Sequence, residues 1–205
     1  MLRKSKFNIL VTGVGGQGIL TLSRLLAESA LESNYNVIVS EIHGLAQRGG
    51  SVAVHVRISS DQEPLAPLIP KGGADIMVAL EIHEALRYLD YLSRNGIIVM
   101  NLRVIPPTVP GVRTFKIDEA QKILSELNVK YYGINADELA LEMGKPYVAN
   151  VIVLGFLAGL NVLPMNRESY ISAIRKVFSE KVIPENINAF ELGYSLAVKN
   201  IQERP

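Results

Sequence analysis

The residues best suited to bind a ligand form a glycine-rich turn near the N-terminus. Gly13, Gly15 and Gly18 have the spacing G-x-G-x-x-G, with Gly16 and Gln17 between them. Glycines permit a tight turn and let the backbone approach a ligand closely. Free amides and the dipole at the start of a helix attract an anion. The spacing therefore indicates a phosphate-binding turn where a strand precedes it and a helix follows it.

Three interpretations of this turn stay open. In the first, the chain is an NAD(P)- or FAD-binding oxidoreductase, and Glu41 binds a ribose hydroxyl at the end of the second strand. In the second, the turn binds another phosphate-bearing ligand. In the third, the glycines only let a strand and a helix pack closely. A Walker A loop is excluded, because Ile19 and Leu20 occupy the places of the Lys and Ser/Thr that would hold phosphate and Mg²⁺.

A second polar, glycine-rich loop follows the second predicted strand. Its nine residues, His43 to Ser51, include three glycines. This is too short for the crossover helix that a dinucleotide-binding fold would place there. Arg48 is the leading candidate for carboxylate or phosphate recognition, because a guanidinium is suited to both. The alternative is a structural turn in which Arg48 pairs with a carboxylate. The candidate binding residues of this loop are His43, Gln47, Arg48, Gly49, Gly50 and Ser51.

Hydrophobic periodicity locates the elements that must position these loops. Strands are predicted at 7–12, 37–41, 52–58, 75–80, 97–102 and 129–134. Helices are predicted at 17–32, 81–92, 119–127, 136–143, 149–160, 167–177 and 185–201. A turn is expected at Asn95-Gly96. The opening order of strand, glycine turn, helix and strand favours a parallel βαβ unit.

The fold class that follows is α/β. We expect a three-layer, Rossmann-like, mostly parallel sheet with helices on both faces and an α-rich C-terminal third. The chain is predicted to be a single domain over residues 1–205. Its α/β core would cover about 6–135, and a helical part over about 136–205 would pack onto the sheet.

Composition excludes several classes of protein. The chain has no cysteine, which argues against a disulfide framework, a thiol nucleophile or an iron–sulfur cluster held by its own side chains. Its three histidines lack the spacing of a metal site, and we interpret His55 and His83 as ordinary residues of a strand face and a helix surface. A net charge of +1 gives no reason to expect nucleic acid as a partner. The apolar stretch 147–163 is too short to span a bilayer, so we expect a cytoplasmic protein.

Three segments together resemble a known family. They are Gly13-Val-Gly-Gly-Gln-Gly-Ile-Leu20, Glu41-Ile-His-Gly-Leu-Ala-Gln-Arg-Gly-Gly-Ser51 and Asn150-Val-Ile-Val-Leu-Gly155. They are similar to the gamma-type domain of 2-oxoacid:ferredoxin oxidoreductases, over roughly residues 7–180. The second segment is especially similar to the beta subunit of the indolepyruvate ferredoxin oxidoreductases.

The resemblance implies the small subunit of a heteromeric enzyme. Such an enzyme oxidatively decarboxylates indolepyruvate or another arylpyruvate, with coenzyme A (CoA) as co-substrate, to an aryl-acetyl-CoA, CO₂ and reduced ferredoxin. Thiamine diphosphate and the iron–sulfur clusters are expected on the large alpha subunit, so this chain alone would bind no cofactor and be inactive. Its partners would be that subunit and, through the holoenzyme, ferredoxin. An isolated chain could form a homodimer through its apolar C-terminal helices.

The resemblance also indicates which residues approach CoA or the subunit interface. No residue is assigned as catalytic or metal-binding, because no nucleophile has a matching base. Asn150 has two interpretations, a satisfied residue at a helix start or a functional side chain. A ligand-free assembly subunit is the remaining alternative. The candidate residues are Gly13, Gly15, Gly16, Gln17, Gly18, Glu41, His43, Gln47, Arg48, Gly49, Gly50, Ser51 and Asn150.

Overall fold

A six-stranded sheet organises the chain. The computed structural model describes residues 5–44, 49–61, 66–106 and 114–202. The strands are β1 (Lys6–Val14), β2 (Asn36–His43), β3 (Ser51–Ser59), β4 (Ala74–Ala79), β5 (Leu92–Asn101) and β6 (Lys130–Ile134). Their order across the sheet is β2-β3-β1-β4-β5-β6.

Five of the strands run in one direction, and β3 alone runs against them. β3 pairs antiparallel with both β1 and β2, whereas the β1–β4, β4–β5 and β5–β6 pairs are parallel. The expected parallel βαβ unit is therefore only partly right. β1 and β2 point the same way, but β3 lies between them. The physical reason is the short second loop, which can join antiparallel strands but is too short for a parallel crossover.

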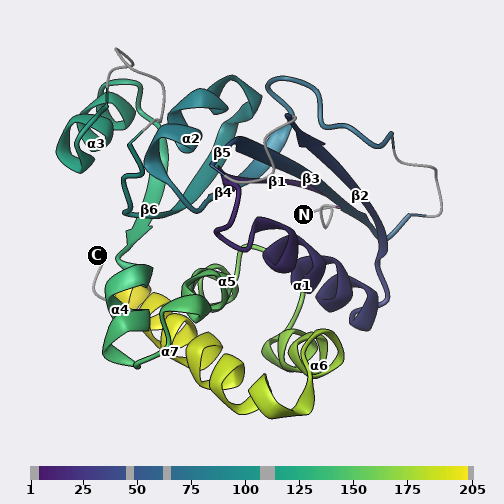
Figure 1. Cartoon of the computed structure of the whole chain (residues 1–205). Helices are drawn as coiled ribbons and strands as arrows, with labels where there is room; N and C mark the ends of the chain where they lie inside the picture. The colour runs from purple at the N-terminus through teal and green to yellow at the C-terminus, as the bar shows by residue number, and fades with distance from the viewer. Residues whose placement is uncertain (1–4, 45–48, 62–65, 107–113, 203–205) are drawn as a thin grey trace.

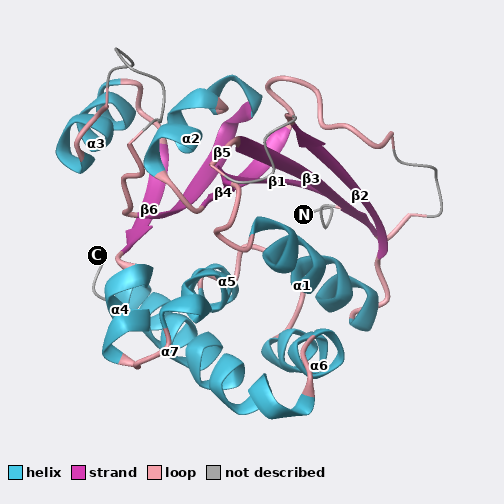
Figure 2. Cartoon of the chain, viewed as in Figure 1, coloured by secondary structure: helices cyan, strands magenta, loops and turns pink. Residues whose placement is uncertain are grey.

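Helices cover both faces of the sheet, which confirms the expected fold class (Figures 1 and 2). One face carries α2 (Ile82–Arg87) and α3 (Ile117–Glu126). The other carries α1 and the helical C-terminal third. These helices are α1 (Ile19–Glu32), α4 (Ala136–Glu142), α5 (Ala149–Gly159), α6 (Arg167–Val177) and α7 (Ile183–Gln202).

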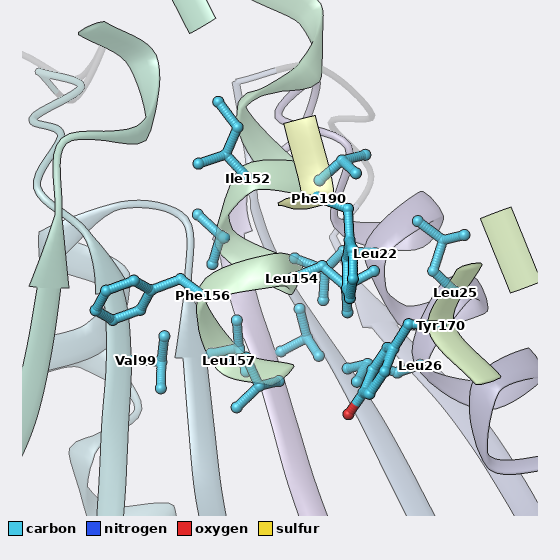
Figure 3. Close-up of a cluster of buried hydrophobic side chains, with 14 of the residues drawn as sticks. Leu22, Leu25, Leu26, Val99, Ile152, Leu154, Phe156, Leu157, Tyr170 and Phe190 are labelled. Carbon is cyan, nitrogen blue, oxygen red and sulfur yellow. The ribbon is translucent and has the colours of Figure 1, made fainter. Parts of the chain in front are cut away.

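The side chains of β1 are buried on both faces of the sheet. Ile9 and Val11 belong to the core beneath α1 and α5, and Leu10 belongs to the core beneath α2 and α3. Alternation along a strand sends neighbouring side chains to opposite faces. A strand buried on both faces therefore needs the near-continuous apolar run that the sequence has here. Figure 3 shows part of the larger core, where Phe190 lies against Leu22 of α1 and Tyr170 of α6, and Phe156 faces Val99 of β5.

The segment between β4 and β5 differs from the prediction. The expected helix 81–92 divides into α2 and a 3-10 turn over Leu89–Tyr91, and β5 already begins at Leu92. The predicted turn at Asn95-Gly96 lies inside β5. There the pairing with β4 jumps from Ala74–Leu92 to Ile76–Ile97. Gly96 allows this irregularity, because a Cβ at that position would lie 2.8 Å from the carbonyl oxygen of Ala74.

Helix α5 lies in the core and does not form part of the protein surface. Nine of its eleven residues are buried, and it packs against α7, α4 and β5. It is therefore not available for the homodimer contact that we expected from the apolar C-terminal helices. Within the described ranges, no helix combines the length and apolar character needed to cross a membrane.

His55 should make the stability of the fold depend on pH. Its ring is buried on β3, its Nδ1 accepts a hydrogen bond from the amide of Ile69 at 3.1 Å, and it meets the ring of Tyr91 edge-on. Burial, helped by the charge of Arg57, lowers the pKa of His55. The unfolded chain then takes up a proton at a higher pH than the folded chain. The free energy of unfolding should therefore fall as the pH drops below about 6.5, the ordinary pKa of histidine.

Urea denaturation at pH of about 7.5 and about 5.5 measures this effect. The matched control is His55→Asn, which keeps an acceptor near the Nδ1 position but does not titrate. The variant should lose less stability between the two pH values than the parent chain. Equal losses in the two proteins would contradict the assignment.

Candidate functional site

A cavity of about 450 Å³ lies outside the carboxyl ends of β1, β4 and β5. The glycine turn after β1, Leu80 after β4 and Asn101 at the end of β5 contribute to its lining. From β1 the chain continues to β2 on one side of the sheet, while β4 lies on the other side. This is a topological switch point, where open α/β sheets bind their ligands. The sheet topology thus favours this cavity as a binding site.

The glycine turn is held in place by its own glutamine. The side-chain Oε1 of Gln17 accepts a hydrogen bond from the amide of Val14 at 2.8 Å, and its Nε2 donates to the carbonyl oxygen of Leu80 at 2.8 Å. Gln17 thereby ties the end of β1 to the end of β4. Gly16 and Gly18 have φ of 106° and 80°, which glycine adopts without steric cost. The spacing of the motif therefore reflects the backbone conformation of this turn.

The start of α1 presents free amides to this cavity. Gly18 is the N-cap residue and so offers no side-chain cap, and the first turn of the helix holds no acidic residue. The first amides of a helix have no partner within the helix, and the helix dipole adds positive potential there. Gly18 and Thr21 both line the cavity. This end of the cavity is thus suited to an anionic group.

Asn150, which lies 132 residues after Gly18 in the sequence, helps to position the glycine turn. Its Nδ2 donates a hydrogen bond to the carbonyl oxygen of Gly18 at 3.1 Å, and its Oδ1 accepts from the amide of Val151 at 3.0 Å. It is not the N-cap of α5, because that position belongs to Val148. The residue is only 7% exposed and borders the cavity. Asn150 therefore joins α5 to the start of α1.

The second glycine-rich loop meets the first through backbone hydrogen bonds. The amide of Gly15 donates to the carbonyl oxygen of Gly50 at 2.8 Å, and the amide of Gly49 donates to that of Gly15 at 3.2 Å. The Oγ of Ser51 donates to the buried carboxylate of Glu84 on α2. The structure thus brings together the two motifs that the sequence singled out.

Several candidate residues that were predicted from the sequence lie outside the cavity. Glu41 and His43 are exposed at the end of β2, which β3 separates from β1. Neither they nor Gly49, Gly50 and Ser51 line the cavity. Glu41 is therefore not placed to bind a ribose in this cavity. The predictions for Gln47 and Arg48 lie outside the described residues.

Polar residues that were not singled out from the sequence line the opposite wall. Asn101 donates hydrogen bonds to Asp137 and to the carbonyl oxygen of Leu80, and its Oδ1 accepts from the amide of Ala136 at 2.9 Å. Arg103 forms an ion pair with Asp137. Asn101 and Arg103 end or follow the fifth predicted strand. The rule that ligands bind beyond the carboxyl ends of parallel strands was the available signal for them.

The C-terminal helices complete the cavity. Glu185, in the first turn of α7, accepts hydrogen bonds from the Nζ of Lys145 at 2.8 Å and from the hydroxyl of Tyr147 at 2.9 Å. The contact with Lys145 holds the pKa of Glu185 below its usual range, although burial opposes this. No local pattern in the sequence links these residues to the glycine turn, because they lie far from it along the chain.

One histidine is less exposed than expected. We predicted His83 on a helix surface, but only 12% of its side chain is exposed. Its Nδ1 lies 2.6 Å from a carboxylate oxygen of the buried Glu81, and its Nε2 accepts from the amide of Phe115 at 2.8 Å. Since Nε2 accepts, the neutral ring carries its proton on Nδ1 and donates it to Glu81. The pair links α2 to the segment before α3.

Comparison with known proteins agrees with this architecture. The model of the family described as pyruvate ferredoxin/flavodoxin oxidoreductase matches residues 8–196. Indolepyruvate oxidoreductase subunit IorB of Archaeoglobus fulgidus is 43% identical, covering 94% of this chain and 96% of its own length. The protein of the same name in Thermococcus kodakarensis is 40% identical with the same coverage of both chains.

A solved structure shows the same fold. It is a 2-oxoglutarate:ferredoxin oxidoreductase of Magnetococcus marinus, with a TM-score of 0.71 and 22% identity. The match covers 96% of this chain and 32% of that one, so the fold occurs there as one part of a longer chain. The family match and the full-length similarity to the two archaeal subunits lead to one conclusion: the chain belongs to the pyruvate ferredoxin/flavodoxin oxidoreductase family and is a subunit of a 2-oxoacid:ferredoxin oxidoreductase.

Proposed function

We propose that this chain is the small subunit of an indolepyruvate oxidoreductase. The observation that carries the proposal is the 43% identity to subunit IorB of Archaeoglobus fulgidus over nearly the full length of both chains. The ketoisovalerate oxidoreductase subunit VorA of Methanothermobacter thermautotrophicus is 27% identical, and the match spans only 37% of it. The chain is thus more similar in sequence to the indolepyruvate subunits than to VorA. Its length also agrees better with theirs.

In this proposal the chain works only in a complex. Its partner is a large subunit that carries thiamine diphosphate and the iron–sulfur clusters, and ferredoxin accepts the electrons. The absence of cysteine supports this division of labour, because cysteine thiolates are the usual ligands of such clusters. The complex converts an arylpyruvate and CoA to an aryl-acetyl-CoA, CO₂ and reduced ferredoxin. We propose further that residues 1–205 act as one gamma-type domain and that the protein is cytoplasmic.

The role of this chain in the reaction is to bind CoA. The Magnetococcus marinus structure is described with CoA and succinyl-CoA bound, which makes CoA the first ligand to consider for the cavity. We propose that an anionic group of CoA meets the free amides at the start of α1, where Gly16 leaves room for it. Gln17, Asn150 and Gly50 hold the turn in the required shape. The remaining members of the second loop are proposed to face the large subunit or the mouth of its active site.

Assembly and turnover test the proposal as a whole. The chain should co-purify with a cysteine-rich, thiamine-dependent large subunit, and the complex should reduce ferredoxin with indolepyruvate and CoA. Pyruvate, 2-oxoglutarate and 2-oxoisovalerate serve as competing substrates. A complex that prefers one of these three would contradict the assignment to indolepyruvate. A complex active without CoA would contradict the role of the cavity.

Filling the cavity from α1 should abolish CoA binding. A bulky residue at Gly16 would combine steric block with backbone strain, since φ is 106° there. Thr21 lies on the helix and lines the same cavity, so Thr21→Trp adds volume without that strain. We expect the affinity of the complex for CoA to fall by about tenfold or more in calorimetric titration. Thr21→Ser is the matched control and should bind normally. Unchanged affinity in the tryptophan variant would place CoA elsewhere.

A further inference from the structure

Arg103 brings a positive charge to the wall of the cavity. It is the only cationic side chain among the described residues that line it. Its backbone is fixed on both sides, because its amide donates to the carbonyl oxygen of Asn101 at 2.8 Å and its own carbonyl oxygen accepts from the amide of Ile82 at 3.1 Å. Its side chain is nevertheless 46% exposed. The guanidinium is therefore anchored near the end of β5 and remains accessible to a ligand.

One edge of this guanidinium is not used by the fold. Its Nη1 donates to a carboxylate oxygen of Asp137, and no residue in the described ranges accepts a hydrogen bond from its Nε or Nη2. Arg167 provides the contrast, because its Nε, Nη1 and Nη2 all donate to Glu191 or Glu168. The Nε and Nη2 of a guanidinium present two parallel N–H groups, which bind a phosphate or a carboxylate through two hydrogen bonds. Arg103 keeps this fork available.

Asp137 orients the guanidinium and leaves the fork open. One of its carboxylate oxygens accepts from Arg103, and the other accepts from the Nδ2 of Asn101. Asn101 is itself buried, and its Oδ1 accepts from the amide of Ala136 at 2.9 Å. The ion pair has no net charge, so the recognition of an anion here depends on the direction of the two N–H groups. A donor that is oriented in advance loses little conformational entropy when a ligand binds.

The cavity thus offers two separate places to anions. The free amides at the start of α1 form the first, and the fork of Arg103 on the opposite wall forms the second. CoA carries two anionic groups on one ribose, a 5′-diphosphate and a 3′-phosphate. NAD carries only a diphosphate. Two such places therefore suit CoA better than the dinucleotide that the glycine spacing alone had left open.

We infer that Arg103 is a specificity-determining residue, whose Nε and Nη2 donate hydrogen bonds to a phosphate group of bound CoA. The inference rests on the proposed function, because it takes CoA as the occupant of the cavity. The 3′-phosphate and the diphosphate can both accept from the fork, and the chemistry is the same for both. The other anionic group then meets the amides at the start of α1.

Arg103→Gln removes the charge and the fork together. We expect calorimetric titration of the assembled complex with CoA to show an affinity lower by about tenfold or more. Arg94→Gln is the matched control, because it makes the same change at an exposed arginine near the start of the same strand and outside the cavity. That variant should bind CoA normally. An Arg103→Gln complex that binds CoA as tightly as the parent overturns the inference and leaves the proposed function standing.

Asp137→Asn separates ligand contact from structural support. This change removes a negative charge from the cavity and leaves the guanidinium in place, so it should strengthen the binding of CoA. If Arg103 only supports the wall through its ion pair, breaking that pair from either side should have the same effect. A loss of affinity in Asp137→Asn as large as that in Arg103→Gln overturns the inference. A smaller loss or a gain supports it.

Titration with 3′-dephospho-CoA identifies the phosphate. If the fork binds the 3′-phosphate, this analogue should bind the parent and the Arg103→Gln complex equally. If it binds the diphosphate, Arg103→Gln should lower the affinity for the analogue by the same factor as for CoA. Either result supports the inference. A parent complex without affinity for CoA overturns the proposed function and the inference with it.

Discussion

Gly193→Ala should destabilise the chain by about 3 kcal/mol or more, because two helix backbones touch at this residue. A Cβ on Gly193 of α7 would lie 2.0 Å from the carbonyl oxygen of Ile152 on α5. A Cβ on Gly155 of α5 would lie equally close, at 2.0 Å, to the carbonyl oxygen of Phe190. The obstacle is backbone in both cases, so no side chain can move aside. The helices would have to separate.

Separating these helices would open the larger core. Phe190 stacks against Tyr170 of α6, and Phe156 faces Val99 of β5; both are buried and would lose contacts (Figure 3). A domain of this kind has roughly 5–15 kcal/mol of total stability, so the loss is a large fraction of it. Gly155→Leu, with a larger side chain at the reciprocal contact, should prevent folding.

Urea denaturation followed by circular dichroism measures the effect. Gly44→Ala is the matched control, because a Cβ there would meet nothing within 4 Å and its φ is not positive. We expect that change to alter the free energy of unfolding by less than about 0.5 kcal/mol. A Gly193→Ala chain as stable as the parent would show that the helices do not cross this closely.

Gly18→Ala should cause the largest loss of function, about a hundredfold or more in CoA affinity of the complex. Two effects combine at this residue. Its φ of 80° is unfavourable for alanine, and the new Cβ would lie 2.4 Å from the Nδ2 of Asn150. Asn150 must then leave its hydrogen bond with the carbonyl oxygen of Gly18. The free amides at the start of α1 would lose the geometry in which they face the cavity.

A double-mutant cycle separates the two effects. Asn150→Ala alone removes the hydrogen bond and should weaken CoA binding moderately. In the double variant Gly18→Ala/Asn150→Ala the clash disappears and only the unfavourable φ remains. Its loss of affinity should therefore be smaller than the sum of the two single losses, expressed as free energies. Additive losses would show that Gly18 and Asn150 do not act on each other, and would contradict the proposed role of Asn150.

The glycines show which features of the structure can be predicted from local sequence and which cannot. Gly13 to Gly18 predicted a tight turn between a strand and a helix, and β1 and α1 flank that turn. The helical periodicity of α1 and α6 and the alternation in β3 were also sufficient to locate those elements. In contrast, no local pattern in the sequence indicated that Gly155 and Gly159 serve helix packing. These glycines allow close packing against α7, and α6 separates α7 from α5 along the chain.

The sequence by itself determined the local elements, the two glycine-rich loops, the family resemblance and the exclusion of cysteine chemistry. These depend on residue type and on spacing over a few turns of chain. The tertiary structure decided which strands are neighbours, and so placed β3 between β1 and β2. It also placed Asn150 against Gly18, and Glu185 rather than Glu41 in the cavity. The physical reason is that periodicity fixes which face of an element is buried, whereas long-range packing alone selects the element that covers it.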